Sequence, residues 1–585
     1  MADRAAEANV SDLLRDAAAR YPGRPALIGD DLLRSWAEVE AAADAGAADL
    51  IRAGLSTGTR VIVALPSGAD LIVAMFAVAR AGLVAVPVDP ARTDLAVIAG
   101  RVQADAGIAL SREHGRVTAF TPVDIARWWS APPGSFGRTL GGGEDLAMVA
   151  RASHSDHAVM LSHRAVLAAV QAIRAAPGLG LRDVDRVLLV LPLHHPSGFI
   201  TAFLPLATAG AAGVLPSAAD PGAALAAVRK HRASIIPAAP GLFHEFAHEP
   251  GADRALASVR LMTSGAAPLD PTDFAAIRRL TGQSVWEGYG VSESSSVVSS
   301  ALMAKTARPG SVGLPLSGIS VRIGGVDEDE DAADGDELVA ALGGEGEVGR
   351  IEIKGTTLFS GYWPDGAGGP DADGWFVTGD YGYLDDRGEL HLVDRASETL
   401  TVAGFTVFPR EVEEVLADHP YVAGAAVVGV PGPAGDDVVA ILVARPGTRP
   451  TPADLDEFVA TRLPTFKQPV HYRVVDALPR KELGRIDRQA ARLAYASAEG
   501  IDLTAPAAAL TAVIAARGVA EPTTKEGDSA PPTAAEATAE PADEPDVAPE
   551  PAGDLAELGN RLLGHDRGGR GVEDTDEDLF GDEVG

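Results

Sequence analysis

Short apolar runs rich in β-branched residues alternate with helical stretches through about the first four hundred residues, and this alternation limits the folds open to the chain. The clearest case is a strand predicted at Val61–Leu65, a helix at Ala69–Ala81 and a second strand at Val84–Val88. This order predicts a βαβ unit. The alternation therefore favours an α/β fold with largely parallel sheets covered by helices.

The same alternation returns further along the chain. A helix is predicted after Asp270, which suits the N-cap, with Pro271 in the first turn. Further strands are predicted at Val187–Leu191, Ser234–Ile236, Arg260–Met262 and Val285–Trp286.

The length of 585 residues suits more than one domain. We expect a large N-terminal domain of mixed and parallel sheets covered by helices over residues 1–394, and a small α+β domain over residues 395–497. Residues 498–585 are predicted to be a disordered acidic tail rich in Ala, Pro and Glu. Within the tail, residues 554–563 are predicted to form a short helix. The acidic run at 326–338 is expected to be a solvated loop.

The charge of the chain argues against one class of partner. The net charge is −33, and 19 acidic against 4 basic residues from Glu521 onward place −15 of it in the tail. Neither part offers the basic surface that nucleic-acid phosphates require, so we expect no nucleic-acid binding. The absence of cysteine excludes disulfides, thiol nucleophiles and cysteine-ligated metal sites.

One uncharged stretch, Pro196–Ala219, is long enough to cross a bilayer. Proline and glycine interrupt it, which favours a buried helix followed by a buried strand over a membrane span. The N-terminal segment MADRAAEANVSDLL lacks the apolar region of a signal peptide. We therefore expect a cytoplasmic protein without a transmembrane segment.

Seven segments, spread over about residues 10–492, carry a family resemblance. In their order and spacing they resemble the adenylate-forming superfamily of acyl-CoA synthetases, luciferases and peptide-synthetase adenylation domains. The segments are ARAGLVAVPVDP (79–90), LPLHHPSGF (191–199), TSGAAPL (263–269), EGYGVSES (287–294), TGDYGYLDDRGELHLVDR (378–395), VAGFTVFPREVE (402–413) and LPRKELGRIDR (478–488).

The resemblance implies an AMP-forming acyl-CoA synthetase. Such enzymes activate a carboxylic acid, here expected to be a fatty acid, with ATP and Mg²⁺ to an acyl-adenylate, and the small domain then rotates so that CoA can attack it. A carboxylate is a poor electrophile until its oxygen becomes a leaving group. The site must therefore hold a triphosphate, a magnesium ion and a ribose, and must neutralise charge as pyrophosphate departs.

Several residues match the nucleotide-binding positions of the family. By the resemblance, Asp380 and Arg395 contact the ribose, Glu293 is the magnesium-associated carboxylate and Ser292 contacts phosphate. Without that context, Asp380 would be a solvated turn residue. The segments that match those flanking the adenine, with the tyrosine in the stacking position, contain Gly265, Ala266, Gly288, Tyr289 and Gly290.

His195 lies where the family often places an aromatic residue near the acyl pocket. It would border the substrate carboxylate, or it is a hydrogen-bonded histidine of the core, and both alternatives stay open. The abundant Ala, Val and Leu around the expected pocket indicate an apolar acyl chain.

The phosphate loop of the family, approximately [ST]-S-G-T-T-G-x-P-K-G, is replaced here by residues 150–157, ARASHSDH. This segment is about three residues shorter, contains no glycine and places His157 where the lysine would be. Glycine allows the close backbone approach to anions that such loops need. Asp156 adds a negative charge there, although Arg151 remains available for phosphate. We therefore predict impaired binding of the ATP phosphates.

The C-terminal segment shows a related change. Arg485 stands where the family uses a catalytic lysine that bridges carboxylate, phosphate and ribose oxygens. A planar guanidinium cannot take the place of a compact ammonium, so the exchange is not neutral. At the hinge, Ser397 replaces the usual Asp or Lys, and Thr401 occupies another position that is often lysine.

Two functions therefore remain open. The first is an active ligase with altered phosphate binding, and the second is a non-catalytic relative that binds an acyl or AMP ligand and acts through a partner. The tail offers a candidate contact, because Leu555, Leu558 and Leu562 have the spacing of a helix that docks into a hydrophobic groove. The alternative is a solubilising acidic tail without a partner.

Overall fold

The computed structural model describes residues 7–503 with gaps at 93, 105, 110–124, 135, 153–156, 219, 325–347, 396–397, 403–404, 433–434, 482–484 and 502. The predictions for the acidic run 326–338, for the tail and for its helix at 554–563 fall outside the described residues.

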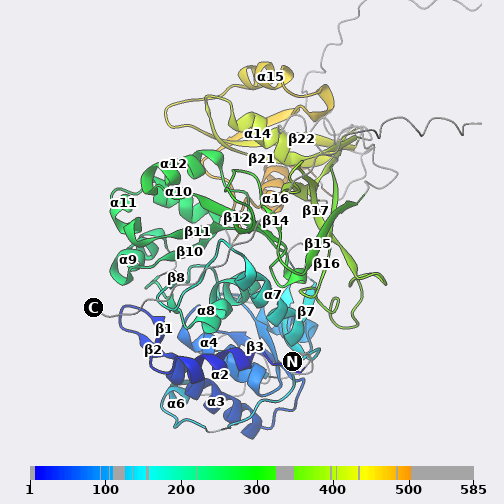
Figure 1. The fold of residues 1–585 in the computed structure, drawn as a ribbon. Helices are drawn as coiled ribbons and strands as arrows, with labels where there is room; N and C mark the ends of the chain where they lie inside the picture. Colours follow the sequence, from blue (N-terminus) through cyan, green and yellow to red (C-terminus); the bar gives the residue numbers. More distant parts are fainter. Residues whose placement is uncertain are drawn as a thin grey trace, which may run out of the picture. The chain divides into compact units, whose positions relative to one another are not determined.

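The largest sheet has nine strands, in the order β14-β13-β12-β11-β10-β8-β9-β1-β2 (Figure 1). Its centre, from β12 to β1, is parallel, and antiparallel strands extend it at both ends. Its strands are β1 (Pro25–Ile28), β2 (Leu33–Ser35), β8 (Arg186–Leu188), β9 (Ala212–Val214), β10 (Ile235–Ala238), β11 (Leu261–Ser264), β12 (Val285–Tyr289), β13 (Ser299–Ser300) and β14 (Leu314–Pro315).

The second sheet has five strands, in the order β5-β3-β4-β6-β7, and contains the predicted βαβ unit. Strands β3 and β4 pair in parallel, and α4 connects them. Because α4 is apolar on nearly all sides, it is buried on nearly all sides. Only β6 and β7 pair antiparallel, as a hairpin. The strands are β3 (Arg60–Ala64), β4 (Val84–Pro87), β5 (Ala106–Ala109), β6 (Leu146–Arg151) and β7 (Ala158–Ser162).

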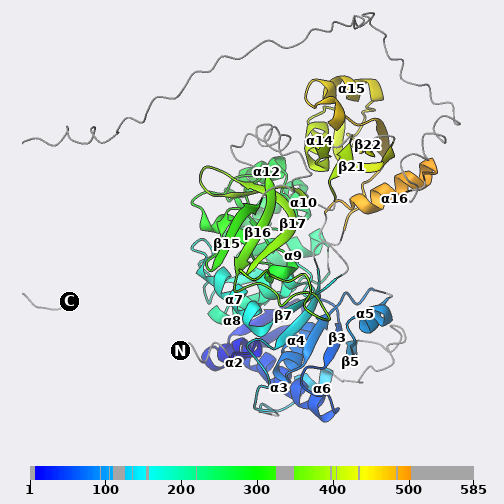
Figure 2. The same cartoon turned by 90° about the vertical axis from the view of Figure 1, so that its right-hand side faces the viewer.

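Helices pack against both sheets. Helices α9 to α12 lie beside β8 to β12, and α2, α3, α4 and α6 lie together near β3 (Figures 1 and 2). The predicted cap of α12 is confirmed, since the Asp270 side chain accepts a hydrogen bond from the Thr272 amide at 2.7 Å. The helices are α2 (Ser11–Arg20), α3 (Trp36–Arg52), α4 (Ala69–Arg80), α5 (Leu95–Arg101), α6 (Ile125–Trp129), α7 (His163–Ala175), α9 (Pro221–His231), α10 (Pro240–His248), α11 (Ala252–Ala255) and α12 (Pro271–Thr281). Short 3₁₀ turns are η2 (Leu256–Ser258), η3 (Ser292–Ser294) and η4 (Ala301–Met303).

The uncharged stretch after Pro196 forms a buried helix followed by a buried strand, as predicted. A π-helical segment, η1 (Ser197–Phe203), continues into α8 (Leu204–Ala209) and then β9. Gly210 ends α8 in the left-handed region with φ of 69°. Across the described part of the chain, no helix has the length and apolarity needed to cross a membrane.

Two further sheets follow. A wholly antiparallel sheet of four strands has the order β15-β16-β17-β18. A sheet of five strands has the order β20-β19-β22-β21, with β23 parallel to β22. The large α/β and small α+β organisation is confirmed, whereas the domain limits at 394/395 and 497/498 stay predictions. The elements are β15 (Ile319–Gly324), β16 (Gly349–Gly355), β17 (Trp375–Leu384), β18 (Leu390–Arg395), β19 (Leu400–Val402), β20 (Phe405–Val407), α14 (Pro409–Ala417), β21 (Val422–Gly432), β22 (Gly435–Ala444), α15 (Pro452–Ala460), η6 (Thr465–Lys467), β23 (His471–Val475) and α16 (Arg488–Glu499).

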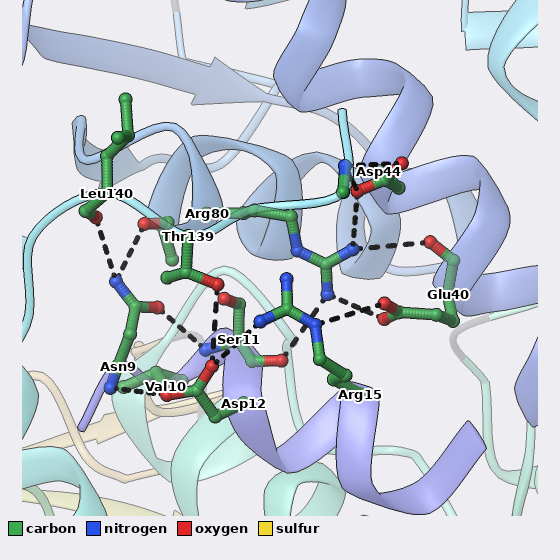
Figure 3. Close-up of polar contacts among 12 residues, drawn as sticks. Asn9, Val10, Ser11, Asp12, Arg15, Glu40, Asp44, Arg80, Thr139 and Leu140 are labelled. Carbon is green, nitrogen blue, oxygen red and sulfur yellow. Dashed lines mark hydrogen bonds and ion pairs between the residues drawn. The ribbon is translucent and has the colours of Figure 1, made fainter. Parts of the chain in front are cut away.

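A buried polar cluster ties the N-terminal helices to the segment that leads into β6 (Figure 3). The fully buried Arg80 of α4 binds Glu40 at 2.6 Å and Asp44 at 3.4 Å, both on α3. Asp44 also accepts the Phe136 amide at 2.7 Å, and the Asn9 side chain donates to the Leu140 carbonyl at 3.3 Å. A buried charge is tolerated only when it is paired in this way. Here these contacts hold the segment before β6 against the N-terminal helices.

Candidate active site

The hydroxyl of Tyr289, at the end of β12, donates to Oδ2 of Asp380 on β17 at 2.7 Å. Both side chains are buried. A register shift between Asp380 and Gly382 interrupts the β17–β18 ladder beside this pair, and such bulges re-aim side chains. The structure therefore brings together two predicted nucleoside contacts that are 91 residues apart. The backbone of Arg395 pairs opposite Asp380.

The two predicted adenine-flanking segments also meet. A Cβ added to Gly265 would lie 3.4 Å from the Gly288 carbonyl oxygen, which places the two backbones side by side. A Cβ at Gly290 would lie 2.2 Å from the Ser296 carbonyl oxygen, so this position accepts glycine alone. Ala266 has a positive φ of 71°, a left-handed conformation that costs free energy in a non-glycine residue.

Glu287, just before the glycine–tyrosine–glycine turn, is a buried carboxylate to which the motif gave no role. It accepts backbone hydrogen bonds from Leu269 at 3.1 Å and Gly310 at 3.0 Å. Burial raises the pKa of Glu287 to about 6, although both hydrogen bonds act in the opposite direction. Its contacts hold the TSGAAPL segment against β12.

Glu293 lies buried in η3, directly after the Ser292 that the sequence assigned to phosphate, and Ser292 is buried too. Oε1 of Glu293 accepts a hydrogen bond from the hydroxyl of Tyr362 at 2.9 Å. Burial, together with the nearby Glu293 carboxylate, raises the pKa of Tyr362. Among the residues that the structure describes, Oε2 of Glu293 has no hydrogen-bond partner. A buried carboxylate oxygen without a partner fits a hard cation such as Mg²⁺.

The hairpin β6–β7 stands where the phosphate loop was expected. Arg151 pairs with Ala158, and the Ala152 amide donates to the His157 carbonyl at 2.9 Å. Only residues 153–156 remain to connect the two strands, and they lie outside the described residues. The ring of His157 packs against Tyr362, with centroids 5.0 Å apart. His157 therefore contacts Tyr362, whose hydroxyl donates a hydrogen bond to Glu293.

A cavity of about 1070 Å³ lies beside part of this site, and Asp380, Ser292, Glu293 and His157 are not among the residues that line it. The glycine segments, Tyr289, Arg151 and Ala152 line it, and so does His195. His195 bonds through Nδ1 to the Ser197 hydroxyl at 2.7 Å. The ring is half-buried and lines the cavity, and its role beside the substrate carboxylate stays a prediction. The apolar lining includes Ile173, Leu179, Leu191, Leu206, Ile235 and Trp286.

Arg485 also lines the cavity. Its guanidinium binds Glu398 at 2.6 Å, and both side chains are 15% exposed. Glu398 is shared with Arg488, which also binds Asp394 at 3.0 Å and Glu413 at 2.6 Å. The sequence interpretation missed this ion-pair network. Ser397, the predicted hinge residue, lies outside the described residues, as does the side chain of Arg395.

Family models match both the large and the small part of the chain. The family model for AMP-binding enzymes matches residues 14–121 and 157–363, and the model for the C-terminal domain of these enzymes matches residues 411–485. The chain belongs to the AMP-binding enzyme family. Between its two matched parts, the first model leaves out residues 122–156, which contain nearly all of the altered loop.

Individual members of the family are related over most of this chain. 4-Coumarate–CoA ligase 5 of Oryza sativa is 30% identical over 503 residues, which are 79% of this chain and 90% of that protein. The long-chain-fatty-acid–CoA ligase of Bacillus subtilis is 30% identical over 335 residues, covering 57% of this chain and 58% of that protein.

Solved structures agree on the fold. The ATP-bound MatB of Rhodopseudomonas palustris has a TM-score of 0.74 at 24% identity, over 83% of this chain and 99% of that chain. The amide bond synthetase McbA of Marinactinospora thermotolerans has a TM-score of 0.70 at 27% identity, over 83% of this chain and 100% of that chain. The chain is therefore a member of an acyl-CoA ligase-like, adenylate-forming enzyme family.

Proposed function

We propose that the chain is an AMP-forming acid–thiol ligase that joins an apolar, expected fatty, carboxylic acid to CoA, with a weakened hold on the ATP phosphates. The observation that carries this proposal is the buried Tyr289–Asp380 pair beside a cavity with an apolar lining. The chemistry has two steps. A carboxylate oxygen attacks the α-phosphorus of ATP as the bond to pyrophosphate breaks; the CoA sulfur then attacks the acyl carbon, AMP departs, and the thiol proton passes to solvent.

The nucleoside would be held by the predicted set around Asp380. Its carboxylate accepts from vicinal hydroxyls, which suits a ribose, and the hydrogen bond from Tyr289 fixes its position. The Gly265 and Gly288 backbones lie side by side, and neither residue has a side chain that projects from this surface. Such a flat backbone surface beside a tyrosine ring suits a planar base.

Glu293 is the residue that would hold Mg²⁺, because its Oε2 is buried without a partner among the described residues. The ion, when bound, supplies positive charge to the departing pyrophosphate. The chain's own contribution is to keep Glu293 in place, through the Tyr362 hydroxyl at 2.9 Å and through the Phe359 amide, which donates to the Glu293 carbonyl at 2.8 Å.

Phosphate binding is the weak part of the site. A hairpin closed at Ala152 and His157 leaves four residues, none of them glycine, to wrap a triphosphate. Loops that bind phosphate use several backbone amides in conformations that glycine favours. Arg485 retains a cation at the cavity, but its charge is already paired with Glu398, so it neutralises less of the charge that develops during adenylation.

A second candidate function is a non-catalytic relative that binds AMP or an acyl-adenylate and acts through a protein partner, reached by the tail. The closed hairpin and the Arg485–Glu398 pair favour it, because both affect turnover while the nucleoside contacts remain. This candidate differs from the first in two respects: it makes and breaks no bonds, and it acts through a protein partner.

The two half-reactions separate these candidates. The full chain is first given ATP, Mg²⁺ and a panel of carboxylic acids, and pyrophosphate is measured. It is then given a synthetic acyl-AMP and CoA, and acyl-CoA is measured. We expect slow pyrophosphate release but clear acyl-CoA formation, because the second step needs no phosphate loop. Asp380→Asn is the control and should slow both steps. Absence of both products, with AMP binding retained, would leave only the non-catalytic function.

A further inference from the structure

Two exposed histidines and one buried carboxylate meet on the helices beside the nine-stranded sheet. His244 and His248 lie one turn apart on α10, and Asp273 lies in the first turn of α12. One candidate ligand atom from each side chain lies within 4.8 Å of the others. The two helices pack together (Figure 1). Neither the family resemblance nor the proposed ligase function gives these residues a role.

The hydrogen bonds indicate which ring nitrogen carries the proton in both histidines. Nδ1 of His244 lies 3.1 Å from both carboxylate oxygens of Asp273, and Nδ1 of His248 lies 2.7 Å from the main-chain carbonyl oxygen of His244. Carbonyl and ionised carboxylate oxygens only accept, so each Nδ1 carries the proton and donates. In the neutral imidazoles, the lone pair is therefore on Nε2 of each ring.

The arrangement matches the way proteins prepare histidine as a metal ligand. A ligating imidazole usually donates its other N–H to a carboxylate or a backbone carbonyl, which fixes the ring and makes it more basic. Here His244 has the carboxylate and His248 has the carbonyl. The ring centroids are 4.5 Å apart, and histidines four residues apart on a helix share one face. The Asp273 side chain is only 11% exposed, whereas the His244 side chain is 57% exposed, so the ring that Asp273 orients is open to solvent.

We propose that His244 and His248 bind a divalent transition metal such as zinc through their Nε2 atoms, with Asp273 as the residue that positions His244. Two imidazoles select zinc, copper or nickel over magnesium, which prefers oxygen ligands. The site lies close in sequence to the cavity, because α10 follows the cavity-lining residues Pro237 and Ala238. Bound metal would strengthen the contact between α10 and α12 through the His244–Asp273 hydrogen bond.

The test uses the full chain after treatment with EDTA and its removal. Zinc is titrated by calorimetry in excess Mg²⁺, which keeps oxygen-only sites occupied, and cobalt is titrated by visible absorption. We expect one zinc per chain, at least about tenfold weaker binding in His244→Ala and in His248→Ala, and a loss of about tenfold in Asp273→Asn, typical of a residue that orients a ligand. His471→Ala, which removes an exposed histidine from β23, is the matched control and should bind like the unmodified chain.

Thermal unfolding gives a second measurement that does not depend on enzymatic activity. Zinc should raise Tm in the unmodified chain and in His471→Ala, because metal bound only to the folded state stabilises it, and should have no such effect in His248→Ala. Circular dichroism without metal checks that each variant folds. The proposal is wrong if the unmodified chain binds no zinc at about 100 μM, or if the two histidine variants bind zinc as it does.

Discussion

The two halves of the proposed nucleotide site differ in how closely they match the motifs of the family. The nucleoside half has a buried, hydrogen-bonded pair, Tyr289 and Asp380, and two half-buried glycine segments whose backbones lie side by side. In the phosphate half, β6 and β7 pair as a hairpin with one register shift, and the connection between them is short and has no glycine. Strand pairing and core packing stabilise these strands independently of the loop that connects them, so the loop can differ from the family pattern while the strands are present.

The largest expected effect is a loss of folding stability at low pH. It tests whether the strands of the phosphate half are packed as the structure shows. His163 follows β7 directly, and its Nδ1 accepts the Val10 amide at 3.1 Å. Burial lowers the pKa of His163 from its ordinary 6.5 to about 4, although the carboxylates of Asp145 and Asp12 act in the opposite direction. The unfolded chain binds the proton more readily, so this contribution to stability is complete above pH 6.5 and is lost as the pH falls towards 4.

The size of this effect is about 3 kcal/mol, since each pKa unit is worth about 1.4 kcal/mol. Urea unfolding at pH 7, 5.5 and 4.5 measures it, and His163→Gln should lose less stability over the same range. His471→Gln serves as the control and should follow the unmodified chain. Equal pH dependence in all three proteins would mean that His163 is not buried as a neutral ring, and the contrast between an intact scaffold and an altered loop would weaken.

The next effect tests the nucleoside half. Asp380→Asn should lower AMP affinity by about 30-fold or more, because a charge-assisted hydrogen bond contributes about 1.5–3 kcal/mol. Calorimetry with AMP measures the loss. Asp386→Asn removes a neighbouring exposed carboxylate in the turn after β17 and should leave affinity unchanged. If both variants bind AMP alike, Asp380 does not hold the ribose.

The sequence predicted the fold well because the fold depends on local periodicity. The strands expected around residues 187, 235, 261 and 285 are present as β8, β10, β11 and β12, with ends that differ by at most three residues. The antiparallel pairing of β15 to β18 was not predicted, because pairing is decided by contacts between distant segments.

The site was predictable only where a motif named the residue. The motifs named Tyr289 and Asp380, but not the hydrogen bond between them. Tyr362, which holds Glu293, carries no motif signal. Glu398 follows the predicted hinge, and its bond to Arg485 spans 87 residues, so only the fold reveals that this cation is already paired.

A restoration experiment tests the phosphate half directly. Replacing residues 150–157 with a glycine-rich loop that carries a lysine, together with Arg485→Lys, should raise the rate of adenylation by at least about tenfold, or about 1.4 kcal/mol. The loop change alone and Arg485→Lys alone complete a double-mutant cycle. Both cations act on the same developing charge, so their effects should couple. No gain in a folded double variant would mean that the defect lies elsewhere or that the chain performs a different reaction.

The smallest expected difference is also the most direct comparison of the two halves. If the nucleoside half supplies nearly all of the binding free energy, AMP should bind at least as tightly as ATP, with dissociation constants within about threefold of each other, or about 0.7 kcal/mol. Any residual preference for ATP should depend on Mg²⁺, because Glu293 is the residue proposed to hold the ion near the phosphates. Calorimetric titration with AMP, ADP and ATP, each with and without Mg²⁺, measures the series. Micromolar binding of ATP beside much weaker binding of AMP would show that the short hairpin still grips the terminal phosphates, and the contrast between the two halves would then be wrong.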